Sequence, residues 1–217
     1  MTAVPSALDS ADAKLLATEF DRLPAGVQRL FLAPPLLSAT VQPADAGFAL
    51  ADPAALDRPA PQALLPRLAI KTWRDSGVLG VIYAGLNLRV AAERLLAHPT
   101  APQRRVAAAW LRREQPLRLT LWPYVDFSGV SEVRFLVLPG RRAQRINACL
   151  RGETGRAVGS QLPRLRQAAE AIAAQLPAQP HIVDLGCFAD GRIALVDLNP
   201  GLTPRELAAL RSAEPKA

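Results

Sequence analysis

The chain has 217 residues, of which 50% are hydrophobic and 21% are charged, and its formal net charge is +7. That balance suits one substantial globular domain or two small lobes. No apolar run reaches the roughly 18 residues of a membrane helix.

The start of the chain, MTAVPSALDSADAK, lacks the basic and apolar stretches of a signal peptide. A chain without an export signal that contains only two thiols, Cys149 and Cys187, suggests the reducing cytoplasm, although a single disulfide stays open. The 26 basic residues include only three lysines. A basic chain favours anionic partners, but the arginines are scattered over expected helices without interleaved aromatic residues, which disfavours nucleic acid.

The first part of the chain shows weak patterns. Residues 9–21 predict a short amphipathic helix with Asp9 or Ser10 as its N-cap. Residues 28–66 are rich in Pro and Ala and have little periodicity. We therefore expect residues 1–65 to form a reduced N-terminal region with few regular elements.

Beyond this region, strand-like and helix-like segments are clear. Expected strands cover residues 67–73, 81–88 and 117–127, the first two of which form a hairpin, and residues 131–150 and 181–199 are each expected to form a further hairpin. Expected helices cover residues 89–98, 102–116, 160–177 and 203–214. Because the strands come as adjacent antiparallel pairs, the fold class is α+β. We expect residues 66–125 to form one lobe and residues 126–217 a second.

The last hairpin, HIVDLGCFADGRIALVDLNPG, places acids inside apolar strands. Asp197 and Asn199 are two residues apart and share a face, and Asp184 on the partner strand comes roughly opposite or diagonal to Asp197. Converging carboxylates are costly to desolvate, and Mg²⁺, which prefers oxygen ligands, would resolve that conflict. The alternative is two half-exposed acids on a solvent face.

Lys71 lies within an apolar strand of a chain that almost always uses arginine. A lysine is a compact charge suited to phosphate oxygens, and the small residues Ser76 and Gly77 that follow are typical of a loop whose backbone N–H groups cover phosphates. The glycines follow the lysine, so this is not a Walker A loop. An exposed strand lysine before a simple turn is the alternative.

Two further segments could contact a nucleotide. In LTLWPYVDF, a strand that enters a Pro-containing linker offers backbone groups to an adenine edge, aromatic surface from Trp122 and Tyr124, and Asp126 for a ribose hydroxyl. In SEVRFLVL, Glu132 and Arg134 share a face, and Arg134 could contact a transferring phosphate. The alternatives are core aromatic residues at a strand end and a surface ion pair.

The order of these motifs resembles the ATP-grasp superfamily, over about residues 66–201. Within it, KTWRDSG, LWPYVDF, SEVRFLVLPG and VDLGCFADGRIALVDLNPG are most similar to the compact branch of translation-initiation-factor assembly chaperones, the cell-division-cycle D-type proteins, and their bacterial relatives. The resemblance implies an ATP-grasp-like fold in which two lobes with antiparallel sheets sandwich a nucleotide.

The resemblance also implies roles for particular residues, with ATP and Mg²⁺ as cofactors. Phosphate and nucleotide contacts would come from Lys71, Ser76, Gly77, Leu121, Trp122, Pro123, Tyr124 and Asp126. Mg²⁺ ligands would be Asp184, Asp197 and Asn199. The reacting phosphate would face Arg134, and Arg145 and Arg151 are both candidates for a further arginine.

The function expected from this resemblance is an Mg-ATP-dependent ligase that joins a carboxylate to an amine through an acyl phosphate. The substrates are unidentified, with a protein or peptide among the candidates, and no membrane is involved. The alternative is an ATP-binding assembly chaperone or interaction module without ligase turnover.

Overall fold

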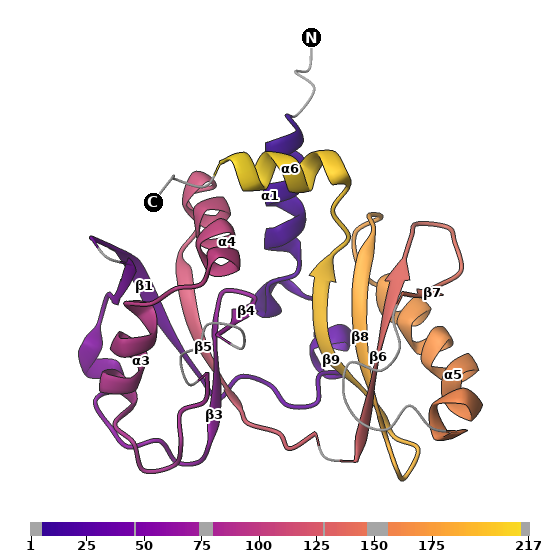
Figure 1. The fold of residues 1–217 in the computed structure, drawn as a ribbon, viewed down its shortest axis with the longest axis horizontal. Helices are drawn as coiled ribbons and strands as arrows, with labels where there is room; N and C mark the ends of the chain where they lie inside the picture. Colours follow the sequence, from indigo (N-terminus) through magenta and orange to yellow (C-terminus); the bar gives the residue numbers. More distant parts are fainter. Residues whose placement is uncertain (1–5, 46, 74–79, 128, 147–155, 214–217) are drawn as a thin grey trace. The chain divides into compact units, whose positions relative to one another are not determined.

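The structure is a computed structural model that describes residues 6–45, 47–73, 80–127, 129–146 and 156–213 (Figure 1). Ser76, Gly77 and Arg151, which the sequence analysis assigned to the site, lie outside the described residues. Among the described residues, no helix is both long and apolar enough to cross a membrane.

The chain folds as two compact units. Unit 1 comprises residues 1–12, 33–124 and 206–217, and unit 2 comprises residues 13–32 and 125–205. Each unit contains one antiparallel sheet, which confirms the α+β fold class. Each unit consists of separate stretches of the chain. The sequence had instead predicted three consecutive segments.

Unit 1 contains a five-stranded antiparallel sheet in the order β2-β1-β5-β3-β4. Its strands are β1 (Leu37–Ala44), β2 (Gly47–Leu50), β3 (Leu64–Leu68), β4 (Lys71–Thr72) and β5 (Leu117–Pro123). Its helices are η2 (Pro53–Leu56), α3 (Leu88–Leu96), α4 (Ala101–Arg112) and α6 (Pro204–Ser212), which begins at the boundary between the units. The N-cap Thr100 and Gln103 form a capping box that starts α4.

The region before residue 66 contributes two strands and the start of a third, so the prediction of few regular elements there was wrong. β1 alternates buried Ala39 and Val41 with exposed polar residues, which is the pattern of a half-buried strand. Pro43 and Pro66 lie within β1 and β3 and masked this pattern, because proline counts against a strand in a sequence. β1 pairs with β5, far along the chain, and local periodicity does not reveal such a partner.

The segment predicted as one strand over residues 67–73 is a tight hairpin. Leu68 is directly opposite Lys71, so only Ala69 and Ile70 form the turn, and Ala69 has a φ of 51°. The strand predicted over residues 81–88 is absent: Ile82 makes only an isolated bridge. The chain then turns and enters α3.

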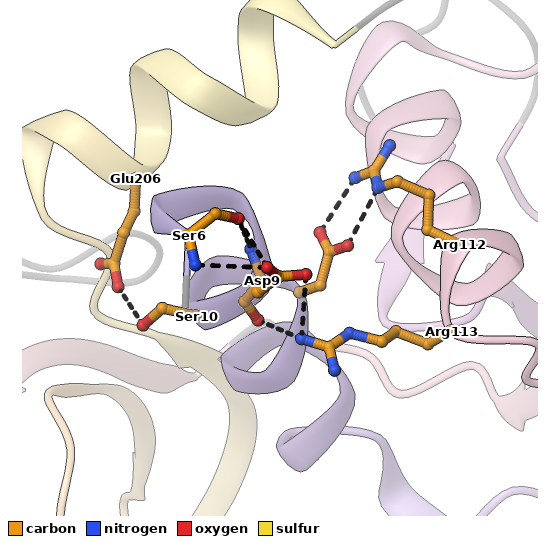
Figure 2. Close-up of polar contacts among 7 residues, drawn as sticks. Ser6, Asp9, Ser10, Arg112, Arg113 and Glu206 are labelled. Atoms are coloured by element: carbon orange, nitrogen blue, oxygen red, sulfur yellow. Dashed lines mark hydrogen bonds and ion pairs between the residues drawn. The ribbon is translucent and has the colours of Figure 1, made fainter. Parts of the chain in front are cut away.

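Polar contacts join α1 (Ala7–Ala17) to α4 and α6 (Figure 2). Asp12, which is 1% exposed, accepts hydrogen bonds from Nε and Nη2 of Arg112, each at 2.9 Å. Ser10 Oγ donates to Glu206 Oε1 at 2.7 Å, and Arg113 donates to the carbonyl oxygen of Asp9. These contacts attach the first part of α1, up to Asp12, and most of α6 to unit 1.

The start of α1 differs from the prediction by two residues. Ser6 Oγ accepts from the Asp9 backbone N–H at 3.1 Å, and Asp9 Oδ2 accepts from the Ser6 N–H at 3.2 Å. This reciprocal pair is a capping box, so the helix begins at Ala7 and not at the predicted residue 9. The hydrogen bond from the Ser6 side chain lowers the pKa of Asp9.

Unit 2 contains a four-stranded antiparallel sheet in the order β7-β6-β8-β9. Its strands are β6 (Val130–Val137), β7 (Gln144–Arg145), β8 (His181–Phe188) and β9 (Ile193–Pro200). Its helices are η1 (Phe20–Arg22), α2 (Ala25–Gln28) and α5 (Arg156–Ala173). α5 packs on one face of the sheet through buried Leu165, Ala169 and Ile172. The predicted final hairpin is confirmed as β8 and β9.

The ion pair of Asp12 and Arg112 should contribute measurably to the stability of the fold. Arg112→Ala should lower the free energy of unfolding strongly, by about 3–5 kcal/mol, because the Asp12 side chain, which is 2% exposed, is then left as an uncompensated buried charge. Urea denaturation measures this change. Arg113→Ala is the control, since its partner Asp9 is well exposed and the effect should be much smaller. Equal effects of the two variants would contradict this account.

His181 predicts a pH dependence of stability. The imidazole is 1% exposed, and burial lowers its pKa below the usual value of 6.5. The unfolded chain therefore binds a proton more readily than the folded chain, so folding stability falls as the pH drops through about 6.5 and stops falling below the folded-state pKa. Urea denaturation between about pH 8 and pH 5 should show a weaker decline for His181→Phe than for the natural chain. Identical declines would exclude a role of His181.

Candidate functional site

One face of the four-stranded sheet carries a row of polar side chains across three strands. Arg134 of β6 is directly opposite Asp184 of β8, and Asp184 is directly opposite Asp197 of β9. Directly opposite residues of an antiparallel sheet project from the same face. Asn199, two residues after Asp197, lies on that face as well. We call these four residues the charged row.

The other face of the same strands is the core of unit 2. Val133, Phe135, Val183, Leu185 and Leu198 alternate with the residues of the charged row and are each at most 2% exposed. They pack in one cluster with α5. Burial of these apolar side chains therefore fixes which face the charged row takes.

A β-bulge in β9 sets the direction of Asp197. The register shifts at Asp184, so that Val196 is an extra residue between Leu195 and Asp197. Leu195 and Leu198 are both buried in the core although an odd number of positions separates them. Strict alternation would put Asp197 on the core face with Leu195, and the bulge places it opposite Asp184 instead.

The segment before β1 covers the edge of β9 at this bulge. Leu195 N donates to the Leu30 carbonyl oxygen at 2.7 Å, and the Leu195 carbonyl oxygen accepts from Leu32 N at 2.9 Å. Both residues belong to unit 2. These bonds satisfy backbone groups of the edge strand at the bulge.

Arg134 and Asp184 form a bidentate ion pair. Arg134 Nε donates to Asp184 Oδ1 at 2.7 Å, and Nη2 donates to Oδ2 at 2.6 Å. The Asp184 side chain is 1% exposed and that of Arg134 is 33% exposed. The hydrogen bonds with Asp184 raise the pKa of Arg134. Glu132, buried at 3% exposed, lies on the same face two residues before Arg134.

Asp197 and Asn199 form the other end of the charged row. Asn199 Nδ2 donates to Asp197 Oδ2 at 3.0 Å, and the Leu198 N–H donates to Asp197 Oδ1 at 3.1 Å. These contacts fix the orientation of the Asp197 carboxylate. They also direct the amide nitrogen of Asn199 toward Asp197.

The donor set of the charged row fits a hard cation. Two carboxylates, opposite each other in the sheet, and a nearby amide offer oxygen ligands, which Mg²⁺ prefers, and Mg²⁺ usually binds through one or two carboxylates plus substrate phosphates and water. Within the described ranges, no three His, Cys, Asp or Glu side chains gather as a metal site.

The register separates Arg145 from the charged row. Arg145 of β7 is exposed and directly opposite Phe135, whose side chain points to the core face. Arg134 projects from the other face. The structure thus does not bring Arg145 to the face of Arg134.

Lys71 lies in β4, at the edge of the sheet in unit 1, and the charged row lies in unit 2. Because Lys71 is directly opposite Leu68, the register puts it on the face that carries buried Leu68 and Leu119. Its carbonyl oxygen accepts from Nε2 of fully buried Gln103 at 3.3 Å. The N-terminal end of α4 is thereby linked to β4.

The expected adenine segment is the end of the central strand β5. Leu121 and Trp122 are 1% and 6% exposed, and Pro123 is opposite Leu64. The backbone is paired on both sides here: the Leu121 carbonyl oxygen accepts from Leu36 N, and Tyr124 N donates to the Ala63 carbonyl oxygen.

Exposed groups begin where β5 ends. The Tyr124 side chain is 49% exposed, and Asp126, which belongs to unit 2, is exposed. Tyr124 is therefore the accessible aromatic side chain of this segment in unit 1. Trp122, by contrast, is a core residue at the strand end, as the alternative interpretation of the sequence had it.

Arg67 is a residue that the sequence analysis did not single out. Its guanidinium carbon lies 4.6 Å from the centre of the Trp122 ring, a cation–π contact. Arg67 is opposite Thr120, and Trp122 Nε1 donates to Thr120 Oγ1 at 2.9 Å. The three residues share the face opposite to that of Lys71. The alternation of buried Leu64, Pro66 and Leu68 in β3 is the signal that places Arg67 there.

Comparison with solved structures identifies the fold. Cdc123 from Schizosaccharomyces pombe matches with a TM-score of 0.52 and 12% identity, over 92% of this chain and 87% of that one. A C-terminally truncated form of it matches with a TM-score of 0.53 and 14% identity, over 99% and 97%. The chain has an ATP-grasp-like fold of the Cdc123 type.

Another solved structure matches with a lower TM-score. The D-alanine-D-alanine ligase from Coxiella burnetii matches with a TM-score of 0.46 and 16% identity, over 94% of this chain and 58% of that one. No protein-family model and no curated protein sequence matches the chain.

The ion pair of the charged row predicts an asymmetry in stability. Arg134→Gln leaves the buried Asp184 carboxylate without its counter-charge and should lower the free energy of unfolding by about 3–5 kcal/mol. Asp184→Asn should cost less, because Arg134 is one-third exposed and water can solvate it. Urea denaturation without divalent cations compares the two variants. A larger loss for Asp184→Asn would contradict this description of the pair.

Proposed function

We propose that the chain binds Mg-ATP and uses it to join a carboxylate to an amine. The observation that carries this proposal is the charged row, in which Asp184 and Asp197 are opposite each other and Asp184 also contacts Arg134. Asp184, Asp197 and Asn199 would bind the ion. The Cdc123-type fold and the order of the sequence motifs support the same assignment.

The chemistry requires positioning and charge neutralisation and no covalent nucleophile from the protein. A substrate carboxylate oxygen attacks the γ-phosphorus, the bond to the β–γ bridging oxygen breaks, and ADP leaves. The amine then attacks the acyl carbon, inorganic phosphate leaves, and the amine nitrogen loses a proton. Mg²⁺, when bound, would neutralise phosphate charge. Arg134, with five N–H donors, is the residue of this face suited to a phosphoryl group.

The phosphate contact in unit 1 has two candidate cations. Lys71 is the contact expected from the sequence resemblance, and Arg67 lies on the opposite face of the sheet beside Trp122. Both residues stay in the proposal. Their positions on opposite faces make them a test of which face of this sheet the nucleotide approaches.

A second candidate function uses the same site without turnover. In it, the chain binds Mg-ATP as an assembly chaperone or interaction module, and nucleotide binding orders a surface for a partner protein. Asp197 favours this candidate, because the sequence resemblance to the chaperone branch includes an aspartate at this position, where most ligases of the superfamily have glutamate. The charged row, including Arg134, has the same binding role in both candidate functions.

Calorimetric titration with a non-hydrolysable ATP analogue and Mg²⁺ tests the proposal. Asp197→Ala should abolish binding, because it removes an ion ligand, while Arg192→Gln, an exposed residue at the tip of the same hairpin, should bind like the natural chain. Of Lys71→Ala and Arg67→Ala, the variant on the face that the phosphates approach should weaken binding, and the variant on the other face should bind like the natural chain. Unchanged binding in Asp197→Ala, Lys71→Ala and Arg67→Ala would exclude the proposed site.

Hydroxylamine separates the two candidate functions. An acyl phosphate reacts with hydroxylamine to give a hydroxamate, so a ligase supplied with Mg-ATP and its carboxylate should accumulate hydroxamate and ADP. Tight nucleotide binding without ADP release across a panel of amino acids and peptides with free carboxylates would favour the chaperone or interaction module.

A further inference from the structure

The ion pair in the charged row creates a conflict for any cation that binds there. Asp184 is one of the two carboxylates that fit an ion, yet both of its oxygens accept hydrogen bonds from the Arg134 guanidinium, at 2.7 and 2.6 Å. A divalent cation bound to Asp184 would lie next to a positive charge. Like charges at such a distance repel strongly when solvent is largely excluded, and Asp184 is 1% exposed.

Removal of that conflict requires a new partner for the guanidinium. Arginine cannot lose its charge in a protein. Its planar fork matches a phosphate group as well as it matches a carboxylate. The Arg134 side chain is one-third exposed, so it can meet a ligand that approaches from solvent, whereas the Asp184 side chain is 1% exposed.

We propose that Arg134 makes the site selective for a metal–polyphosphate complex over a free divalent cation. The part of this inference that concerns the phosphate chain rests on the proposed function. Arg134 neutralises the acids and disfavours a free ion. When a phosphate chain arrives with the ion, Arg134 exchanges its carboxylate partner for a phosphate, and Asp184 becomes available. Arg134 is then a specificity-determining residue as well as a phosphate contact.

If Arg134 disfavours a free divalent cation, replacing Arg134 should increase the affinity of the site for that cation. A neighbouring charge changes the affinity of a carboxylate for a proton by about ten- to a thousandfold. At the low end of that range, Arg134→Gln should bind Mn²⁺, without nucleotide, about tenfold more tightly than the natural chain. The electron paramagnetic resonance signal of free Mn²⁺ measures this binding directly.

Matched variants separate charge from structure. Arg134→Lys keeps the charge and should bind Mn²⁺ as weakly as the natural chain, and Arg192→Gln, an arginine of the same sheet's β8–β9 hairpin that is paired with Asp190, should also be unchanged. The double variant Arg134→Gln/Asp197→Asn should lose the gain. Equal or weaker Mn²⁺ binding by Arg134→Gln, or an equal gain in Arg134→Lys, would overturn the proposal.

A second measurement covers the case in which Arg134→Gln does not fold alone. Added Mn²⁺ should then restore the circular dichroism spectrum of the natural chain, because the ion replaces the missing counter-charge. Failure to fold at any Mn²⁺ concentration would also overturn the proposal.

Mn²⁺ binding in the presence of a nucleotide tests whether Arg134 exchanges Asp184 for a phosphate. A non-hydrolysable ATP analogue should increase Mn²⁺ affinity in the natural chain and do so much less in Arg134→Gln. An equal increase in both would contradict the exchange of partners. If the natural chain binds no nucleotide at all, the proposed function fails, while the results with Mn²⁺ alone still decide whether Arg134 excludes free cations.

Discussion

The structure of unit 2 depends on how the charge of Asp184 is balanced. A carboxylate that is 1% exposed is stable only with a counter-charge and hydrogen bonds, and the Arg134 guanidinium supplies both. Replacement by apolar residues would be a simpler way to build this sheet, since buried ion pairs contribute little net stability. The presence of this pair beside Asp197 therefore favours a binding role for the charged row.

The surrounding fold keeps that row on one face of the sheet. Val183 and Phe135 direct neighbouring side chains into the core, and the bulge at Val196 turns Asp197 toward Asp184. Hydrogen bonds from residues 30–32 cover the edge strand at that bulge, so a segment remote in sequence supports the site. In unit 1, the hydrogen bond between Asp12 and Arg112 likewise joins two segments that are remote in sequence, α1 and α4.

Local sequence patterns predicted much of this arrangement. Two apolar runs around Ala-Asp-Gly identified the β8–β9 hairpin and its converging acids, and the spacing in SEVRFLVL put Glu132 and Arg134 on one face of a strand. Patterns failed where partners are remote, as for β1 and β5, or where prolines interrupt alternation. They also could not give the bulge, because one extra residue reverses the facing of Asp197 without a sequence signal. Arg67 was missed because the strand before Lys71 is short and contains Pro66.

The most direct test is a crystal structure of the chain with Mg²⁺ and a non-hydrolysable ATP analogue. We expect an ion bound by oxygens of Asp184, Asp197 and Asn199, and the Arg134 guanidinium contacting the terminal phosphate instead of Asp184. A triphosphate bound away from the charged row, or an Arg134–Asp184 pair that is intact in the nucleotide complex with no ion beside it, would contradict the account.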